Sequence, residues 1–242
     1  MKNYKLKIFC DFDGTIAKND VWISSFNGFI NDIESFEKVC RDYHSEVLNG
    51  REAGKRHLSL VENFSFAKLD DYLRLEEIDE HFKDFAEFCR VNDHTLVVVS
   101  AGYEYYLDFI LKRYNIDLKI FASELRQTDD KKLFSVFTHS DEYCTLCETC
   151  KRNILINNTN DLDNEISVFI GDGVSDQCVS GFADIVFAKG KLASYCWKNN
   201  ITYFEYKNFS DIKMKLAKLT GNNMIRQRQE AKIRRRDVFM GG

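Results

Sequence analysis

The sequence predicts an α/β protein with a doubly wound parallel sheet and a small helical domain inserted after the first strand. Short apolar segments typical of buried strands recur along the chain, and from residue 95 onward they alternate with segments of helical periodicity. Between the first strand and residue 95 no convincing strand occurs, and apolar residues recur at three- and four-residue spacing. Two carboxylates also follow the first strand directly, where ligands bind in open α/β sheets.

Five segments have the apolar composition of parallel strands buried on both faces: Leu6–Cys10, Thr95–Ser100, Leu118–Ala122, Ile166–Ile170 and Ile185–Ala188. From the second of these on, helical patterns follow the strands, near Glu104–Tyr114, Lys151–Leu155, Asp176–Phe182 and Leu192–Asn199. This alternation is typical of a sheet covered by helices on both faces.

Residues 19–88 are predicted to form a helical cap over a cleft, because their apolar residues follow helical spacing directly after the acidic loop. The core domain would then consist of residues 1–18 and 89–220. The alternative is that the inserted helices only pack on one face of the sheet.

The last segment, residues 221–242, is strongly basic. It carries two acidic residues (Glu230 and Asp237) against six basic ones: Arg226, Arg228, Lys232, Arg234, Arg235 and Arg236. We interpret it as a solvated, partly frayed tail, and contact with RNA or anionic lipid is the alternative.

The bulk composition excludes several classes of protein. The chain has 242 residues, of which 44% are hydrophobic and 30% charged, which is typical of a globular protein. Its formal net charge of −4 argues against nucleic acid as the main partner. No apolar stretch reaches the roughly 18–20 residues that span a bilayer, and no signal-peptide pattern occurs. A cytoplasmic location without a membrane partner is therefore expected. The oligomeric state stays open.

Four separated pieces of sequence carry the groups of a phosphoryl-transfer site. Asp11 and Asp13 follow the first strand, Ser100 ends the second, Lys151 begins a helix, and Gly171–Asp176 follows the strand at 166–170. If these strands are neighbours in a parallel sheet, the four pieces converge on one crevice. A hydroxyl and an ammonium group would hold phosphate oxygens there, and the carboxylates would bind a hard cation such as Mg²⁺.

Together these pieces resemble the four motifs of phosphatases of the haloacid dehalogenase superfamily, over about residues 5–219. The first motif matches Asp11-Phe-Asp13-Gly-Thr15. The helical insertion resembles the cap of the phosphoserine-phosphatase-like branch. Within that branch, the Cys-X-X-Cys-Lys-Arg segment at 147–152 and the stretch Gly-Arg-Glu-Ala-Gly at 50–54 look most like methionine-salvage phosphatases, which act on 2-hydroxy-3-keto-5-methylthiopentenyl-1-phosphate.

The resemblance implies a mechanism through an aspartyl-phosphate intermediate. Asp11 would be the nucleophile, and Asp13 would protonate the leaving group and then activate water. The implied Mg²⁺ site consists of Asp11, the main-chain carbonyl of Asp13, and Asp172, and Asp176 would orient a metal-bound water or Lys151.

Phosphate oxygens would be held by Thr15, Ser100, Ala101 and Lys151. Lys131 and Lys132 are alternatives for the lysine. Lys151 is preferred because the third motif of the superfamily opens the helix before the strand at 166–170.

Substrate choice is assigned to the cap. In phosphoserine phosphatases, an acidic residue at about the place of Asp20 binds the substrate amino group. Arg51, Arg56 and His57 are candidates for contacts with a substrate carboxylate or hydroxyl, although each is equally consistent with a solvated helix residue. Trp22 suits an apolar tail or simple core packing.

A cysteine cluster immediately precedes Lys151. Cys144, Cys147 and Cys150 repeat at every third residue, and His139 lies five residues upstream of the first. This spacing is compatible with a Cys₃His structural zinc site, although the second, more distant cysteine pair of usual zinc sites is missing. Reduced thiols at the start of a helix and an intracellular disulfide are the alternatives.

The sequence therefore predicts a Mg²⁺-dependent phosphomonoester hydrolase acting on a small phosphorylated metabolite. The methionine-salvage enol phosphate is the first candidate substrate. Phosphoserine and phosphoethanolamine or phosphocholine are alternatives, and a phosphomutase or a non-catalytic binding protein on the same fold is less favoured.

Overall fold

A computed structural model of the protein describes residues 4–222 and 224–240. Within them, seven strands form one sheet in the order β4-β3-β2-β1-β5-β6-β7, parallel except for the antiparallel pair β3–β4. The strands are β1 (Lys5–Cys10), β2 (Thr95–Tyr103), β3 (Lys119–Gln127), β4 (Leu133–Val136), β5 (Glu165–Gly171), β6 (Ile185–Ala188) and β7 (Phe204–Glu205).

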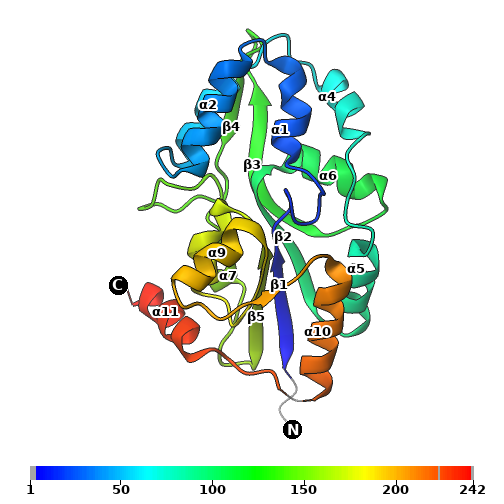
Figure 1. Ribbon diagram of the computed structural model, residues 1–242, viewed down its shortest axis with the longest axis vertical. Helices are drawn as coiled ribbons and strands as arrows, with labels where there is room; N and C mark the ends of the chain where they lie inside the picture. Colours follow the sequence, from blue (N-terminus) through cyan, green and yellow to red (C-terminus); the bar gives the residue numbers. More distant parts are fainter. Residues whose placement is uncertain (1–3, 223, 241–242) are drawn as a thin grey trace.

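Helices cover both faces of this sheet, so the predicted fold class is confirmed. Figure 1 shows α5 and α10 on one side of β1 and β5, and α7, α9 and α11 on the other. The helices are α1 (Val21–Phe26), α2 (Ile33–His44), α3 (Gly50–Ser59), α4 (Phe66–Leu73), α5 (Phe82–Val91), α6 (Glu104–Arg113), α7 (Lys151–Asn157), α8 (Gln177–Ser180), α9 (Gly190–Lys198), α10 (Phe209–Gly221) and α11 (Gln229–Phe239).

The central strands β1, β2, β5 and β6 are mostly apolar because both faces of the sheet are buried there. In β1, Leu6 and Ile8 belong to one hydrophobic cluster, which includes Phe209 of α10. Phe9 follows Ile8, lies on the opposite face of the strand, and belongs to a second cluster with Leu155 of α7. All five predicted strands are present. The sequence did not predict β4 and β7, which lie at the two edges of the sheet and are short.

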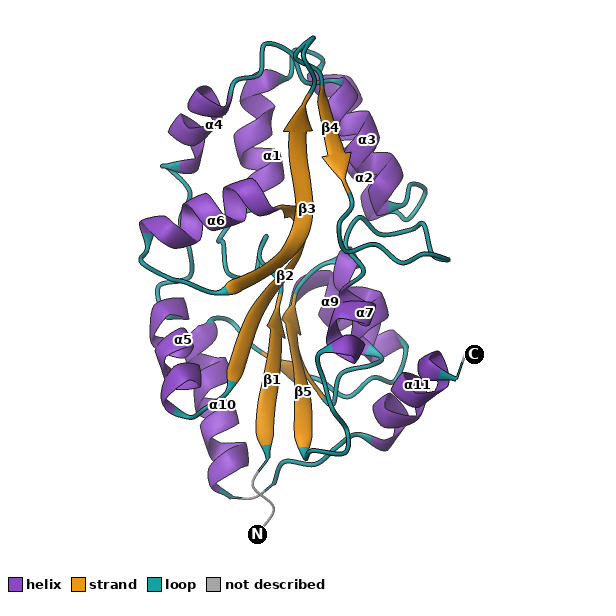
Figure 2. Cartoon of the chain, turned by 180° about the vertical axis from the view of Figure 1, so that it is seen from behind, coloured by secondary structure: helices purple, strands orange, loops and turns teal. Residues whose placement is uncertain are grey.

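The end of the molecule above the carboxyl ends of β1 and β2 combines inserted helices with a hairpin. Figure 2 shows β3 and β4 extending into this region beside α1 and α3. Helices α1–α4 come from the segment predicted as a cap, residues 19–88. Helix α5, most of which comes from the same segment, instead packs against the sheet domain, where the tilted rings of Phe85 and Phe209 lie 5.2 Å apart between centroids. The division into core and cap itself stays a prediction.

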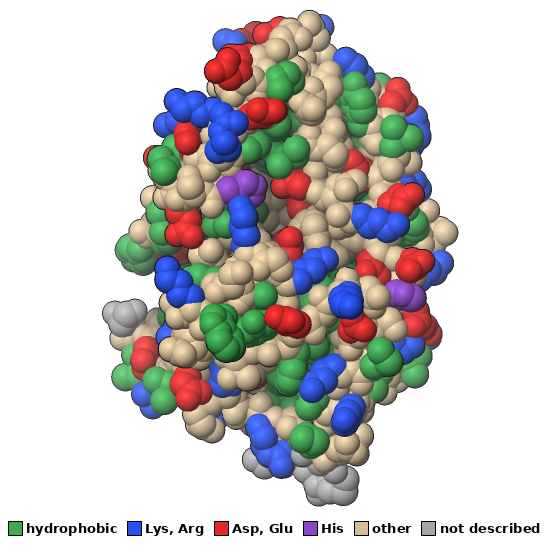
Figure 3. Space-filling view, in the orientation of Figure 1, with side chains coloured by type: hydrophobic (Ala, Val, Ile, Leu, Met, Phe, Trp, Pro, Cys, Tyr) green, Lys and Arg blue, Asp and Glu red, His purple; other side chains and the backbone are tan. Residues whose placement is uncertain are grey.

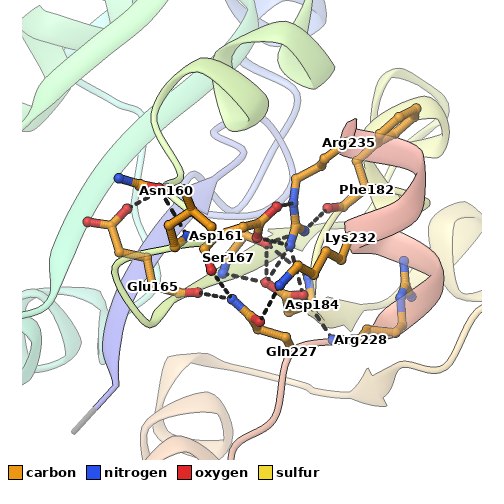
Figure 4. A network of polar contacts seen from close by, with 11 residues as sticks. Asn160, Asp161, Glu165, Ser167, Phe182, Asp184, Gln227, Arg228, Lys232 and Arg235 are labelled. Carbon is orange, nitrogen blue, oxygen red and sulfur yellow. Dashed lines mark hydrogen bonds and ion pairs between the residues drawn. The ribbon is translucent and has the colours of Figure 1, made fainter. Parts of the chain in front are cut away.

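The C-terminal helix is docked, which corrects the interpretation of this segment as a solvated tail. Arg235 of α11 is only 1% exposed and lies in a polar network with side chains of β5 and of the loop before β6 (Figure 4). Its guanidinium donates to Asp184 Oδ1 at 3.1 Å, to Ser167 Oγ at 3.0 Å and to both carboxylate oxygens of Asp161. The main-chain N–H of Arg228 also donates to Asp184, at 2.9 Å. Two carboxylates thus compensate the buried cation, and part of the basic charge is internal.

Candidate active site

The four sequence pieces meet at one edge of the sheet. Strand β1 lies between β2 and β5 and is parallel to both, so the carboxyl ends of the three strands are adjacent. Asp11 follows β1, Ser100 lies near the end of β2, and Asp172 follows β5. The chain therefore assembles the crevice that forms where the strand order reverses direction.

The loop after β1 requires the glycine at its centre. Gly14 has a φ of +70°, and a Cβ atom at this position would lie 2.6 Å from Asp172 Oδ2. Glycine alone combines this left-handed conformation with so close an approach. The hydroxyl of Thr15 donates to Asp172 Oδ1 at 3.0 Å, so the loops after β1 and β5 are tied together.

Lys151 is the lysine that reaches this edge. It begins α7 and is 3% exposed, and its Nζ atom lies 2.6 Å from Asp11 Oδ1 and 2.7 Å from Asp176 Oδ1. Burial acts to lower the pKa of Lys151, but the two carboxylates outweigh it and raise the pKa above its ordinary value. The side chain therefore carries a positive charge. Lys131 and Lys132 lie instead in the exposed turn between β3 and β4.

Three carboxylates form a group that suits a cation. Oxygens of Asp11, Asp172 and Asp176 lie within 4.8 Å of one another. Burial and the neighbouring Asp176 raise the pKa of Asp11 well above its ordinary value and that of Asp172 to about 6. Closely spaced carboxylate oxygens in a buried site are the ligands that Mg²⁺ prefers, and the ion would relieve their repulsion.

Asp176 is held by protein donors on both of its oxygens. Its Oδ1 accepts from Lys151, and its Oδ2 accepts from the main-chain N–H groups of Asp172 and Gly173, each at 3.0 Å. These contacts fit a residue that orients Lys151 and the loop after β5.

Asp13 is surrounded by three hydrogen-bond donors. Its Oδ1 accepts from the main-chain N–H of Val21 at 2.9 Å, and its Oδ2 accepts from Tyr106 Oη at 3.0 Å and from Ser100 Oγ at 3.3 Å. Burial, with a smaller contribution from Asp20, raises the pKa of Asp13 to about 7, and the donors oppose this rise. A carboxyl group with this pKa exchanges a proton near neutral pH, as an acid–base group must.

Tyr106 is a site residue that the sequence analysis missed. It lies on α6 and is 1% exposed, and a Cβ atom at Gly102 would overlap its hydroxyl. Gly102 thus leaves room for the contact between Tyr106 and Asp13. The short separation of Tyr106 from Ser100 in the sequence is the only local signal. The tyrosine reaches Asp13 only because α6 packs against β2 and β3.

Two predicted phosphate ligands make contacts within the protein here. Ser100 is fully buried, and its hydroxyl donates to Asp13 while accepting from the N–H of Gly102 at 2.9 Å. Thr15 is likewise buried and bonded to Asp172. Ala101 lines the cavity above the carboxylates.

That cavity has a volume of about 450 Å³ and opens between the inserted helices and the sheet edge. Figure 3 shows a hollow here, with acidic, basic and histidine side chains at its rim. Besides Asp11, Asp13 and Asp172, its walls include side chains from the start of α1, from α2, α3 and the end of β2, and from the segment before α7: Asp20, Trp22, Tyr43, His57, Tyr103 and Glu148. The volume suits a small metabolite.

The predicted cap residues divide into those that line the cavity and those that do not. Asp20 lines it and also caps α1, accepting from the N–H of Ile23 at 3.1 Å. Arg51 does not line it, because its guanidinium donates to the carbonyl of Cys147 at 2.7 Å. Arg56 is exposed on the surface of α3. His57 lines the cavity and accepts from the indole N–H of Trp22 at 3.0 Å.

The cysteine cluster does not assemble as the predicted zinc site. In residues 4–222 and 224–240, Asp11, Asp172 and Asp176 form the one group of three or more potential metal ligands close enough to share an ion. His139, Cys144, Cys147 and Cys150 do not converge, because Cys150 enters α7 while the 141–147 loop is held by contacts of its own, such as that of the Cys144 N–H with Asp141. The structure lends no support to bound zinc.

Comparison with known proteins places this chain in a family. The model of the haloacid dehalogenase-like hydrolase family matches residues 8–180, which include all four motif pieces. The chain belongs to this family.

Curated relatives are phosphatases by name. The chain is 29% identical over 219 residues to the 2-hydroxy-3-keto-5-methylthiopentenyl-1-phosphate phosphatase of Bacillus cereus, covering 88% of this chain and 97% of the relative. The protein of the same name from Bacillus anthracis is 27% identical over 218 residues, with the same coverage. The predicted class, a phosphatase of this superfamily, is thereby confirmed.

Solved structures support the fold. A phosphoserine phosphatase with an analogue of the phospho-aspartyl intermediate superposes with a TM-score of 0.68 at 21% identity, covering 89% of this chain and 99% of that one. A substrate-bound phosphoserine phosphatase gives a TM-score of 0.66 at 22% identity, covering 88% and 98%. Across the described residues, no helix has the length and apolar character needed to cross a bilayer.

Proposed function

We propose that this protein is a Mg²⁺-dependent phosphomonoester hydrolase that uses Asp11 and Asp13 in two different roles. The observation that carries the proposal is the contrast between their surroundings. Asp11 lies 2.6 Å from the Lys151 ammonium in the carboxylate group, whereas Asp13 is bonded to hydroxyl and amide donors and has a pKa of about 7. Two neighbouring carboxyl groups whose surroundings favour different protonation states are typical of a nucleophile paired with an acid–base residue.

The first step transfers the phosphoryl group to the protein. A carboxylate oxygen of Asp11 forms a bond to phosphorus, the bond from phosphorus to the ester oxygen breaks, and Asp13 gives its proton to the departing oxygen. An alcohol leaves, and the aspartyl-phosphate remains on Asp11.

The second step returns the protein to its starting state. Asp13, now a carboxylate, takes a proton from water while the water oxygen bonds to phosphorus and the bond to Asp11 breaks. Inorganic phosphate leaves, and Asp13 is again protonated. After the complete cycle, Asp11 and Asp13 have the same protonation states as at the start.

The remaining residues bind and orient. Asp11, the main-chain carbonyl of Asp13, and Asp172 would hold Mg²⁺, which supplies positive charge between the phosphate and the nucleophile when bound. Lys151, Thr15 and Ser100, with the main-chain N–H of Ala101, would contact phosphate oxygens. The hydroxyl groups of Thr15 and Ser100, which now donate to Asp172 and Asp13, would then have to donate to the phosphate instead.

The substrate is proposed to be a small phosphorylated metabolite that the inserted helices enclose as a cap. The relatives' names make the methionine-salvage enol phosphate the first candidate. Phosphoserine is less favoured than the sequence suggested, because neither Arg51 nor Arg56 lines the cavity to meet its carboxylate. Phosphoethanolamine and phosphocholine remain alternatives. We expect the protein to act in the cytoplasm.

Phosphate release from a panel of phosphomonoesters tests this proposal. The panel contains the methionine-salvage enol phosphate, phosphoserine, phosphoethanolamine, phosphocholine, pyridoxal phosphate and sugar phosphates, each with Mg²⁺ or with EDTA. Release that requires Mg²⁺ and disappears in Asp11→Asn supports the proposal. Consumption of an ester without phosphate release indicates a mutase, and failure on all esters indicates a binding protein.

A further inference from the structure

Glu148 is a carboxylate in the cavity that belongs to none of the four motif pieces. It comes from the segment between β4 and α7 and lines the cavity together with Asp13 and Asp20. Among the described residues, no hydrogen-bond donor or cation pairs with its side chain, although the other acidic walls of the cavity, Asp11, Asp13, Asp20 and Asp172, all have such partners.

The wall opposite this side chain is shaped to admit it. Gly54 lies in the interior of α3, and a Cβ atom there would overlap Oε1 of Glu148. Glycine inside a helix lowers helix stability relative to alanine. The carboxylate is thus accommodated in the cavity at a structural cost.

Among the described residues, the carboxyl group of Glu148 has no cation next to it that would stabilise its charged form. Burial raises the pKa of Glu148 to about 8, Arg51 opposes the rise, and Asp13 adds to it. Arg51 forms no ion pair with Glu148, because its guanidinium donates to the main-chain carbonyls of Cys147 and Cys144. A cation bound in the cavity would lower this pKa and favour the carboxylate form of Glu148.

The rest of the cavity wall is suited to a cation. Asp20, the N-cap residue of α1, adds a second carboxylate beside Glu148. Lys191 is the one ammonium group of this wall among the described residues. His57 is neutral, since burial lowers its pKa to about 4. Trp22 and Tyr103 present aromatic rings with centroids 5.2 Å apart, and ring faces attract ammonium groups.

We propose that Glu148 is a specificity-determining residue that binds a positively charged nitrogen on the leaving group of the substrate. The substrate class is then a phosphomonoester of an amino alcohol or a quaternary-ammonium alcohol. This choice favours phosphoethanolamine and phosphocholine over the methionine-salvage enol phosphate suggested by the relatives' names, because that ester carries no nitrogen. This inference rests on the proposed hydrolase function and names the chemistry of the substrate for that site.

A matched pair of esters tests the inference. Phosphocholine and 3,3-dimethylbutyl phosphate have nearly the same shape, but a carbon atom replaces the charged nitrogen in the second. We expect kcat/KM of the wild type to favour phosphocholine by about 10-fold or more, the scale for a desolvated cation facing a carboxylate and aromatic rings. In Glu148→Gln this ratio should fall toward one, mainly through KM for phosphocholine. Glu148→Asp, which keeps the charge, should retain part of the ratio.

Glu142→Gln is the control, because Glu142 is an exposed glutamate of the same segment. It should leave the ratio unchanged. Equal kcat/KM for the two esters in the wild type overturns the inference, and so does an equal loss on both esters in Glu148→Gln. The second result would mean that Glu148 supports the fold or donates a hydrogen bond to an uncharged substrate.

Two further measurements separate this inference from the proposed function. Hydrolysis of p-nitrophenyl phosphate reports the chemistry without recognition of a charged leaving group. Hydrolysis of that ester without any preference for phosphocholine would support the proposed hydrolase function and would contradict the role of Glu148. If no ester is hydrolysed, calorimetry decides: tighter binding of phosphocholine than of the isostere, lost in Glu148→Gln, supports cation recognition, and equal binding overturns it.

Discussion

Replacing Tyr106 by phenylalanine should move the basic limb of the pH–rate profile upward by about one to two pH units. The hydroxyl of Tyr106 donates to Asp13 Oδ2 at 3.0 Å in a buried environment, and this bond stabilises the carboxylate form. Hydrogen bonds to charged groups contribute about 1.5–3 kcal/mol, and about 1.4 kcal/mol corresponds to one pKa unit. Losing the bond therefore raises the pKa of Asp13 further above its value of about 7.

The sign of the effect follows from the role of Asp13 in the first step. Asp13 must be protonated to give a proton to the leaving oxygen, so kcat/KM of the wild type should fall above about pH 7. In Tyr106→Phe the protonated form persists to higher pH, and the fall should begin about one to two units later. At neutral pH, kcat of Tyr106→Phe should be lower than that of the wild type, because hydrolysis of the aspartyl-phosphate needs the carboxylate form of Asp13.

The assay is kcat/KM for an alkyl phosphate between about pH 5 and about pH 10, where the limbs report groups of the free enzyme. Tyr103→Phe is the matched control, since its hydroxyl bonds to Ser135 at 2.7 Å and not to Asp13, although Tyr103 lines the same cavity. p-Nitrophenyl phosphate, whose leaving group needs little protonation, should show a weaker limb. An unchanged limb in Tyr106→Phe, or the same movement in Tyr103→Phe, would refute the reasoning.

Three further outcomes are expected. Gly14→Ala should raise the Mg²⁺ concentration for half-maximal activity and lower stability by about 1–3 kcal/mol, because its φ of +70° and the 2.6 Å approach to Asp172 exclude a side chain; unchanged Mg²⁺ titration and urea curves would contradict this. Lys151→Met should reduce kcat by at least about 100-fold while circular dichroism stays native, since a buried ammonium next to the nucleophile is lost; near wild-type turnover would exclude its role. Arg235→Ala should lower the free energy of unfolding by about 3–5 kcal/mol, since the buried carboxylate of Asp184 and the half-buried carboxylate of Asp161 lose their shared cation. Substitution of the exposed Arg236 by alanine should change it little, and equal denaturation midpoints for the two variants would show that the network does not anchor α11.

The positions of the main strands and motifs could be predicted from the sequence because they depend on local composition. Strands buried on both faces need continuous apolar runs, so β1, β2 and β5 stand out from the sequence. Their neighbouring positions then follow from the rule that ligand-binding loops gather at the carboxyl ends of parallel strands. The edge strand β7 was not predicted because a two-residue strand carries no periodic pattern.

Contacts between distant segments were beyond the reach of sequence patterns. Arg235 of the basic C-terminal segment has the composition of a solvated residue, but its partners Asp161 and Asp184 lie more than 50 residues away. Likewise, the sequence suggests that Arg51 could reach a substrate. In the structure, its guanidinium donates to main-chain carbonyls of the 141–147 loop. A charged side chain takes whichever partner the fold brings to it, and local sequence does not record that choice.

The sequence by itself determined the α/β class, the convergence of Asp11, Asp13, Lys151 and Asp172, and the phosphatase chemistry that this convergence implies. The pattern of apolar residues along the chain predicts the strands, and the residues that follow each strand carry the chemistry. Only the tertiary structure decided which side chains surround the acid–base group and line the cavity. Tyr106 and Glu148 acquire their positions from helix packing and from room left by glycines, because the distances that matter there join residues without any fixed spacing in the chain.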